Sequence, residues 1–189
     1  GGHIGRARRL ARDPQARERR AAVLAIPTAL RRADDVFRCA DVLVKTAETE
    51  ASTVSGARDD SEKDALRTAM GADGTGKGAA AANRAANAAV RALEKRQKSR
   101  ATRTARDSLD LALVDLAGFY RDVLATQCGA NATLTHPDRA GDITQIAREC
   151  SPERALRRLE AVLGCRAAIE ANVKPRIAVE ALLSTLHHG

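Results

Sequence analysis

The strongest helical pattern of the chain lies between residues 109 and 124. Large apolar side chains recur there every three or four positions, at Leu109, Leu113, Leu116, Tyr120 and Leu124. This period places them on one face of an α-helix, so it predicts a buried helix that ends near Cys128-Gly129. The same segment carries a second apolar edge, formed by Leu111, Val114 and Ala117, which we expect a single domain to leave uncovered.

Two amphipathic helices are expected before residue 50. Asp13 followed by Pro14 is a typical helix start, since proline is favoured at the first helical position. Pro27 lacks an amide donor and is expected to interrupt this helix, so that Thr28 caps the next one. An apolar stripe then recurs in threes and fours through residues 30–47, which predicts the second helix.

Residues 52–80 interrupt the regular pattern. The apolar period fades through residues 52–61, leaves a weak helix near Met70, and breaks at the glycines between Gly71 and Gly78. Glycine favours loops because it has no side chain to restrict the backbone. We therefore predict a flexible insertion over about residues 52–80, after which helix propensity returns.

Three shorter helices are expected in the C-terminal third. The first carries Ile143, the second starts after Ser151, and the third follows Pro175 and carries Leu182. No segment alternates β-branched or aromatic residues with polar ones over the length of a strand. The sequence thus predicts an all-α bundle of about seven helices.

Composition narrows the functional classes. Aromatic residues make up 2% of the 189 residues, so the core must consist mainly of aliphatic side chains. The net charge of +8 fits a nucleic-acid surface, an acidic partner or an Arg-rich composition alike. The basic run Lys95–Arg106 offers a nucleic-acid surface, but such runs are more often solvated, and no aromatic residue interleaves with this one. No apolar run of membrane-spanning length and no secretory signal is present, so we expect a cytoplasmic protein.

Catalytic chemistry finds little support in the sequence. Residues 71–77 fit the G-x-x-x-x-G-K spacing of a phosphate-binding loop, but Gly78 stands where a Ser or Thr is needed to hold Mg²⁺. The four histidines lack metal-ligand spacing, and the four cysteines form no C-x-x-C pair. We therefore expect no catalytic residue, cofactor or metal, and cysteines that act as small buried apolar residues.

Several segments resemble the C-terminal region of bacterial clamp-loader subunits, whose AAA+ modules load the sliding clamp onto primed DNA. Residues 2–7, G-H-I-G-R-A, resemble the sensor-2 helix that ends the AAA+ lid, with Arg6 as its arginine. Residues 115–124, D-L-A-G-F-Y-R-D-V-L, are similar to the core helix of the helical collar domain. Residues 175–183, P-R-I-A-V-E-A-L-L, look like the collar's last helix, although Lys174 replaces the usual Asn before the proline.

The resemblance implies the end of an AAA+ lid over residues 1–26 and a collar domain, which joins subunits into a ring, over residues 27–189. Within the family it favours the delta-prime subunit of DNA polymerase III, because of the long charged insertion before the F-Y-R-D segment. The high Arg and Ala content suits an actinobacterial source. A gamma/tau subunit and a basic nucleic-acid-binding domain are the alternatives. The implied partners are the gamma/tau and delta subunits, with DNA only indirectly through the complex and no membrane. The implied core or interface residues are Leu109, Leu113, Leu116, Tyr120, Leu124, Pro175 and Leu182.

Overall fold

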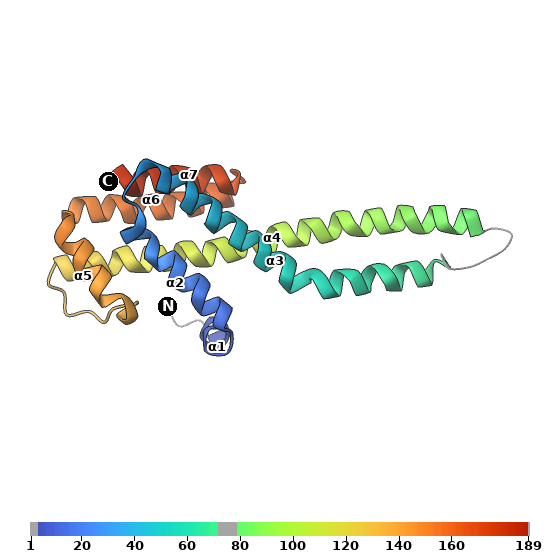
Figure 1. Cartoon of the computed structure of the whole chain (residues 1–189), viewed down its shortest axis with the longest axis horizontal. Helices are drawn as coiled ribbons and strands as arrows, with labels where there is room; N and C mark the ends of the chain where they lie inside the picture. Colours follow the sequence, from blue (N-terminus) through green and yellow to red (C-terminus); the bar gives the residue numbers. More distant parts are fainter. Residues whose placement is uncertain (1–3, 72–78, 189) are drawn as a thin grey trace. The chain divides into compact units, whose positions relative to one another are not determined.

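The computed structural model describes residues 4–71 and 79–188, and this part of the chain is all α-helical, as predicted (Figure 1). It contains no strand, seven α-helices and one short 3-10 helix. In chain order these are α1 (Ile4–Arg12), α2 (Pro14–Ala29), α3 (Ala33–Ala69), α4 (Ala79–Gln127), η1 (Pro137–Arg139), α5 (Ala140–Glu149), α6 (Pro152–Glu170) and α7 (Pro175–His188).

The chain divides into two compact units. The first, called the body here, comprises Gly1–Thr46 and Leu109–Gly189, and the second, called the hairpin, comprises Ala47–Ser108. Helices α3 and α4 each contribute one segment to both units. The core of the body and that of the hairpin are built from different kinds of residues.

The predicted stripe of α4 lies at the centre of the body. Leu113, Leu116 and Val123 are fully buried, and so are their neighbours Phe119 and Tyr120. The Phe119 and Tyr120 rings meet edge to face, with centroids 5.6 Å apart. Aliphatic side chains from the other helices complete this core: Leu24, Val36, Ala40, Ile143, Val162, Val179 and Leu183. The core is therefore mainly aliphatic, as the composition requires, with one aromatic pair inside it.

Two helices of the body end in the same hydrogen-bonded turn. After α4, the Gly129 and Ala130 amides donate to the Thr126 and Ala125 carbonyls, and Gly129 has a positive φ of 60°. After α6, the Asn172 and Val173 amides donate to the carbonyls of Ile169 and Ala168, and Asn172 has a φ of 66°. Both are Schellman motifs, which need a residue that tolerates left-handed backbone angles. The predicted end of α4 is thereby confirmed.

The junction between α2 and α3 differs from the sequence-based expectation. Helix α2 continues through Pro27 to Ala29, because the missing amide falls only in its last turn. The Thr28 hydroxyl donates to the Ala25 carbonyl within α2 and does not cap the next helix. Instead, Asp35 in the first turn of α3 binds the residues just before the helix, since its carboxylate accepts hydrogen bonds from the Arg31 and Arg32 amides at 3.0 and 2.8 Å. Backbone hydrogen bonds to this anion lower the pKa of Asp35.

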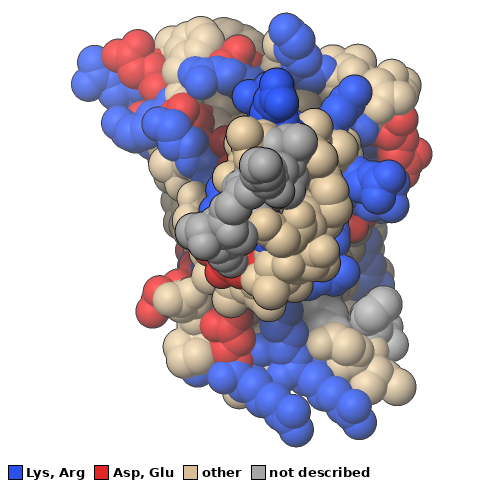
Figure 2. Space-filling model, turned by 90° about the vertical axis from the view of Figure 1, so that its right-hand side faces the viewer, with Lys and Arg blue, Asp and Glu red and all other residues tan. Residues whose placement is uncertain are grey.

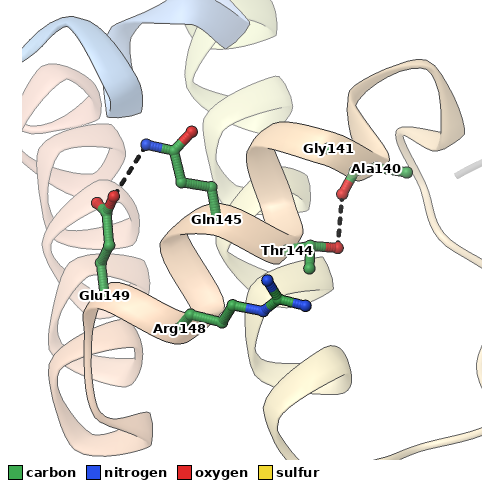
Figure 3. Close-up of a pocket in the computed structure, with 6 residues that line it drawn as sticks. All are labelled: Ala140, Gly141, Thr144, Gln145, Arg148 and Glu149. Atoms are coloured by element: carbon green, nitrogen blue, oxygen red, sulfur yellow. Dashed lines mark hydrogen bonds between the residues drawn. The ribbon is translucent and has the colours of Figure 1, made fainter.

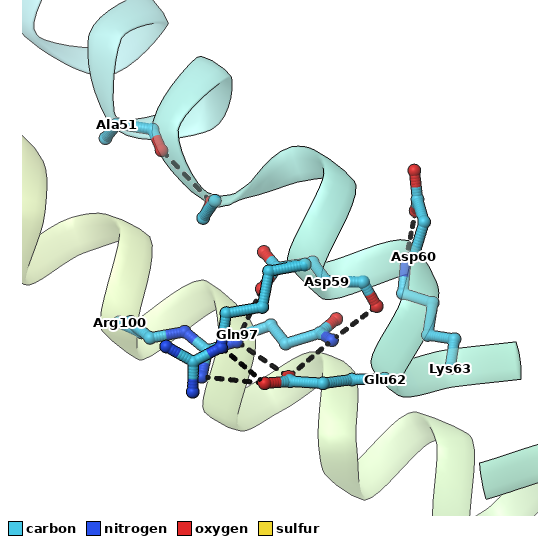
Figure 4. A network of polar contacts seen from close by, with 9 residues as sticks. Ala51, Asp59, Asp60, Glu62, Lys63, Gln97 and Arg100 are labelled. Atoms are coloured by element: carbon cyan, nitrogen blue, oxygen red, sulfur yellow. Dashed lines mark hydrogen bonds and ion pairs between the residues drawn. The ribbon is translucent and has the colours of Figure 1, made fainter. Parts of the chain in front are cut away.

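Helix α3 continues to Ala69, so most of the predicted loop within residues 52–80 is helical. The hairpin is held by small apolar residues such as Ala51, Ala86 and Val90, and by a polar network (Figure 4). Residues 72–78 lie outside the described part of the chain. The flexibility of the insertion stays a prediction.

The polar network of the hairpin joins α3 to α4. The buried Gln97 amide donates to the Asp59 carbonyl at 2.8 Å and to the Glu62 carboxylate at 3.2 Å. Arg100 pairs with the carboxylates of Asp59 and Glu62. Hydrogen bonds from Arg100, then from Arg58 and Gln97, lower the pKa of Glu62 to about 2. Polar pairing at these positions explains why the apolar period fades in the sequence.

Replacing Leu116 tests the central position of α4. Leu116→Ala should lower the free energy of unfolding by about 2 to 5 kcal/mol, because it removes a fully buried leucine side chain. Lys98→Ala, on an exposed position of the same helix, should change it by less than about 0.5 kcal/mol. Urea denaturation measures both, and equal stability of the two variants would contradict the assignment of α4 to the core.

Candidate assembly surface

The residues predicted from the sequence to form the sensor-2 helix, the core or the interface differ in their burial. Arg6 lies in α1, but its side chain is outside the described part. Leu124 and Pro175 are half-buried, and Pro175 is the first residue of α7. The remaining members are buried in the body: Leu109, Leu113, Leu116, Tyr120 and Leu182. Within this chain, the buried members pack the fold and expose almost no surface to a partner.

Asp122, in the segment that resembles the collar core helix, is fully buried and anchors the connection that follows α4. Its carboxylate accepts the His136 backbone amide at 2.8 Å and the Arg121 guanidinium at 2.8 Å. Burial raises the pKa of Asp122, but hydrogen bonds from Thr135, Arg121 and His136 outweigh it, so the pKa lies below its ordinary value. The buried charge is therefore stabilised by donors from the connection.

His136 is buried and hydrogen-bonded through both ring nitrogens. Arg20 lies 2.8 Å from Nδ1, and a guanidinium can only donate, so Nδ1 must accept. Nε2 lies 3.0 Å from the Asp115 carbonyl and must donate to it. The ring is thus fixed as the neutral Nε2–H tautomer. Because Arg20 also pairs with Asp138 at 2.7 Å, this network connects α2, α4 and η1.

Gly118 makes room for this histidine on α4. A Cβ atom at position 118 would lie 2.7 Å from His136 Nε2 and 3.3 Å from the Thr135 side chain. The first distance is too short for two non-bonded atoms, and His136 cannot move without losing its hydrogen bonds. Glycine is therefore required at position 118, directly before the F-Y-R-D segment, because His136 approaches α4 so closely.

The second apolar edge of α4 remains exposed in the body. Leu111 is 40% exposed and Val114 is 36% exposed, while Ala117 is half-buried. This agrees with the expectation from the sequence that one domain leaves this edge uncovered. Large apolar side chains that lie close together at a surface are typical of protein interfaces.

Helix α6 runs antiparallel to α4 and carries two exposed apolar side chains of its own. The Gln127 amide, at the end of α4, donates to the Cys150 carbonyl just before α6, and Arg166 near the other end pairs with Asp110. The Arg166 pair is bidentate, with contacts of 2.6 and 3.1 Å. Val114 stands one turn after Asp110, and Leu163 stands about one turn before Arg166, so they flank the ion pair at the same level.

These exposed residues form what we call the apolar strip: Leu111, Val114, Leu156 and Leu163. Leu156 and Leu163 are 47% and 48% exposed, and their spacing of seven residues places them on one face of α6. The Arg166–Asp110 pair fixes the two helices that carry the strip. The arrangement offers exposed apolar side chains, with no nucleophile or metal ligand among them.

Helix α5 carries a hollow at its surface (Figure 3). It is lined by Ala140, Gly141, Thr144, Gln145, Arg148 and Glu149. Gln145 donates to Glu149 at 2.9 Å, and the Thr144 hydroxyl donates to the Ala140 carbonyl at 2.8 Å. All its lining residues come from one helix, so it is a shallow surface feature that cannot enclose a ligand.

The described residues offer neither a metal centre nor a membrane span. Within residues 4–71 and 79–188, no three His, Cys, Asp or Glu side chains lie close enough to hold a metal ion. No helix in this part is both long and apolar enough to cross a bilayer. Cys165 is buried, which raises the pKa of its thiol to about 11, as expected of a small core residue. Cys39 and Cys150 are only half-buried and Cys128 is exposed, so the expectation of buried cysteines was wrong for Cys128.

Comparison with known protein families shows to which family the chain belongs. Residues 82–188, more than half of the chain, match the family model described as DNA polymerase III, delta subunit, C terminal. The chain belongs to this family. It is therefore part of a clamp-loader subunit, and the matched domain is a non-catalytic helical one. Neither the curated proteins nor the solved structures give a match.

The family assignment confirms the clamp-loader resemblance at the level of the subunit family. It does not distinguish delta-prime from delta or gamma/tau. The matched region contains both halves of the apolar strip, as well as Gly118, Asp122 and His136. Sequence reasoning found the α4 edge but missed Leu156 and Leu163 as surface residues, because their period of seven also fits a buried stripe.

A glycine pair tests the close approach between α4 and His136. In an open helix, Gly→Ala should stabilise by roughly 0.5 to 1 kcal/mol, and Gly164→Ala, with no atom near the new Cβ, should do so. Gly118→Ala should instead destabilise by about 1 to 3 kcal/mol, because the methyl group overpacks against His136. Thermal and urea unfolding of the two variants measure the difference, and stabilisation by both would show that His136 can move aside freely.

Proposed function

We propose that the chain is the collar region of a delta-prime subunit, which holds neighbouring clamp-loader subunits together during DNA replication. The family supplies the clamp-loader role, and the apolar strip is the observation that supports assembly as its function. A replication role also implies a cytoplasmic location. The buried α4 residues then act indirectly, by fixing the helices that present the strip.

The physical case for assembly rests on the composition of the apolar strip. Removing apolar surface from water contributes roughly 25 cal/mol per Å². Four large aliphatic side chains on two helices form the kind of apolar centre found at protein interfaces. Their surroundings are charged, with the Arg166–Asp110 pair and exposed Arg157 and Glu160 on the same helices. A polar rim around an apolar centre is the usual arrangement of a specific interface.

The proposal also assigns residues 1–26 to the end of an AAA+ lid. Helix α1 supports this, since its described side chains are mostly exposed and Ile4 is an exposed large apolar residue. Such a helix has apolar surface available for structure that precedes it in a longer protein. The collar would then comprise residues 27–189, with the hairpin as a charged insertion.

Delta-prime is favoured over gamma/tau by the charged hairpin before the core helix. Residues 47–69 contain six acidic and three basic residues, and residues 79–108 contain eight basic and two acidic ones, which makes this insertion strongly polar. The expected partners are then the gamma/tau and delta subunits. Binding of the chain to each purified subunit, measured separately, distinguishes this assignment from a subunit that associates only with its own copies.

A charge placed in the apolar strip should break this assembly. Leu163→Glu adds an exposed carboxylate where the partner is expected to bury apolar surface, so the Kd for gamma/tau or delta should rise at least tenfold, about 1.4 kcal/mol or more. Val54→Glu is the matched control, because Val54 is also an exposed apolar residue but lies in the hairpin. Isothermal titration calorimetry measures both affinities, and circular dichroism checks that the fold is retained.

The affinities of the two variants together test whether the apolar strip is the interface. Binding weakened by Leu163→Glu alone supports assembly through the strip. If both variants bind as tightly as the original chain, or if only Val54→Glu weakens binding, the apolar strip is not the interface.

A further inference from the structure

A row of basic side chains follows one face of the hairpin segment of α4. Arg84, Arg91, Lys95 and Lys98 are all exposed. Their spacings of seven, four and three residues keep them on the same face of an α-helix. With a rise of 1.5 Å per residue, the row is roughly 20 Å long. We call these four residues the basic stripe.

The charges of the basic stripe are not neutralised by the hairpin. None of the four side chains forms an ion pair within the described part of the chain. Arg100, by contrast, is turned toward Asp59 and Glu62 on α3 and pairs with both carboxylates (Figure 4). The basic run Lys95–Arg106 therefore contains two kinds of charge. Arg100 is paired with carboxylates of α3, whereas Lys95 and Lys98 form no ion pair with the described residues.

The surface around the stripe lacks the features of a protein interface. Between Ala79 and Asp110, no large apolar side chain with a described position is exposed. Protein interfaces depend on apolar or aromatic residues at their centre, and a membrane-surface helix needs a free apolar face. The apolar face of this segment is already used, since Ala86 and Val90 are buried in the hairpin. The stripe can therefore bind only through charge.

A polyanion with evenly spaced charges fits a straight row of cations. Duplex DNA carries one negative charge per roughly 1.7 Å of its axis, so several phosphates lie within the length of the stripe. Single strands are usually held by aromatic side chains that stack on bases, and residues 47–108 contain no aromatic residue. The same absence excludes base stacking as a source of sequence preference.

We propose that the basic stripe is a sequence-independent contact for the phosphate backbone of duplex DNA. This goes beyond the assembly role, because it gives the chain a direct contact with DNA through the hairpin. Figure 2 shows one face of the molecule on which blue Lys and Arg side chains outnumber red Asp and Glu ones, in agreement with the net charge of +8.

Charge-neutral variants of the full chain test the contact. The stripe variant combines Arg84→Gln, Arg91→Gln, Lys95→Gln and Lys98→Gln, which preserves helix propensity. The control variant combines Arg12→Gln, Arg32→Gln, Arg148→Gln and Lys174→Gln, four exposed basic residues of the body. Both variants lose the same positive charge. Fluorescence anisotropy with a labelled duplex, repeated over a range of salt concentrations, measures binding.

The expected result is a loss confined to the stripe variant. For the original chain, log K should fall with log salt concentration with a slope of about −3 to −4, as expected for about four phosphate contacts. The stripe variant should bind at least tenfold more weakly, with a slope reduced by about 1 for each contact removed. The control variant should bind within about threefold of the original chain, a difference of less than 1 kcal/mol.

Three results would overturn the proposal. Equal weakening by both variants would mean attraction by net charge alone. Tighter binding of a labelled single strand than of the duplex would mean a different nucleic-acid site. Undiminished duplex binding by the stripe variant, combined with lost binding to a purified clamp-loader subunit, would mean that the stripe contacts an acidic protein. Since Leu163→Glu leaves the stripe intact, that variant should still bind duplex DNA, which separates this proposal from the assembly role.

Discussion

Burial of one face of α4 is the constraint on which the body depends. Leu113, Leu116 and Val123 are inaccessible to solvent, and the Phe119–Tyr120 pair fills the space beside them. A helix has a fixed period, so once this face is buried, the direction of the other α4 side chains within the body is determined. Leu111 and Val114 are therefore held outward, and the Arg166–Asp110 pair holds α6 beside them. The apolar strip is a consequence of the core rather than a separate feature.

The polar side of α4 is constrained as tightly as its apolar side. Asp122 and the Asp115 carbonyl bind His136 from two directions, and Arg20 fixes the neutral tautomer of its ring. The ring lies so close to α4 that only glycine fits at position 118. A buried network of this kind stabilises one arrangement only if all its members are satisfied, which ties the connection after α4 to α2.

The sequence predicted the helices that have an apolar period and missed those held by polar contacts. The stripe from Leu109 to Leu124 marked the core of α4 because aliphatic packing leaves a periodic trace. Helix α3 was expected to fade after residue 52 but continues to Ala69, since Gln97 and Arg100 replace apolar contacts there. The His136 network could not be foreseen, because Arg20 lies 116 residues away in the chain. Gly118 likewise gives no signal until its neighbour is known.

Assembly as proposed requires the apolar strip to be the surface through which this clamp-loader domain joins its neighbours. The most direct test is the structure of the assembled clamp loader containing the full chain, determined by cryo-electron microscopy. We expect Leu156 and Leu163 on α6, with Leu111 and Val114 on α4, to be buried there against an adjacent subunit. An assembly in which these four side chains face solvent, while another surface of the chain forms the contact, would contradict it.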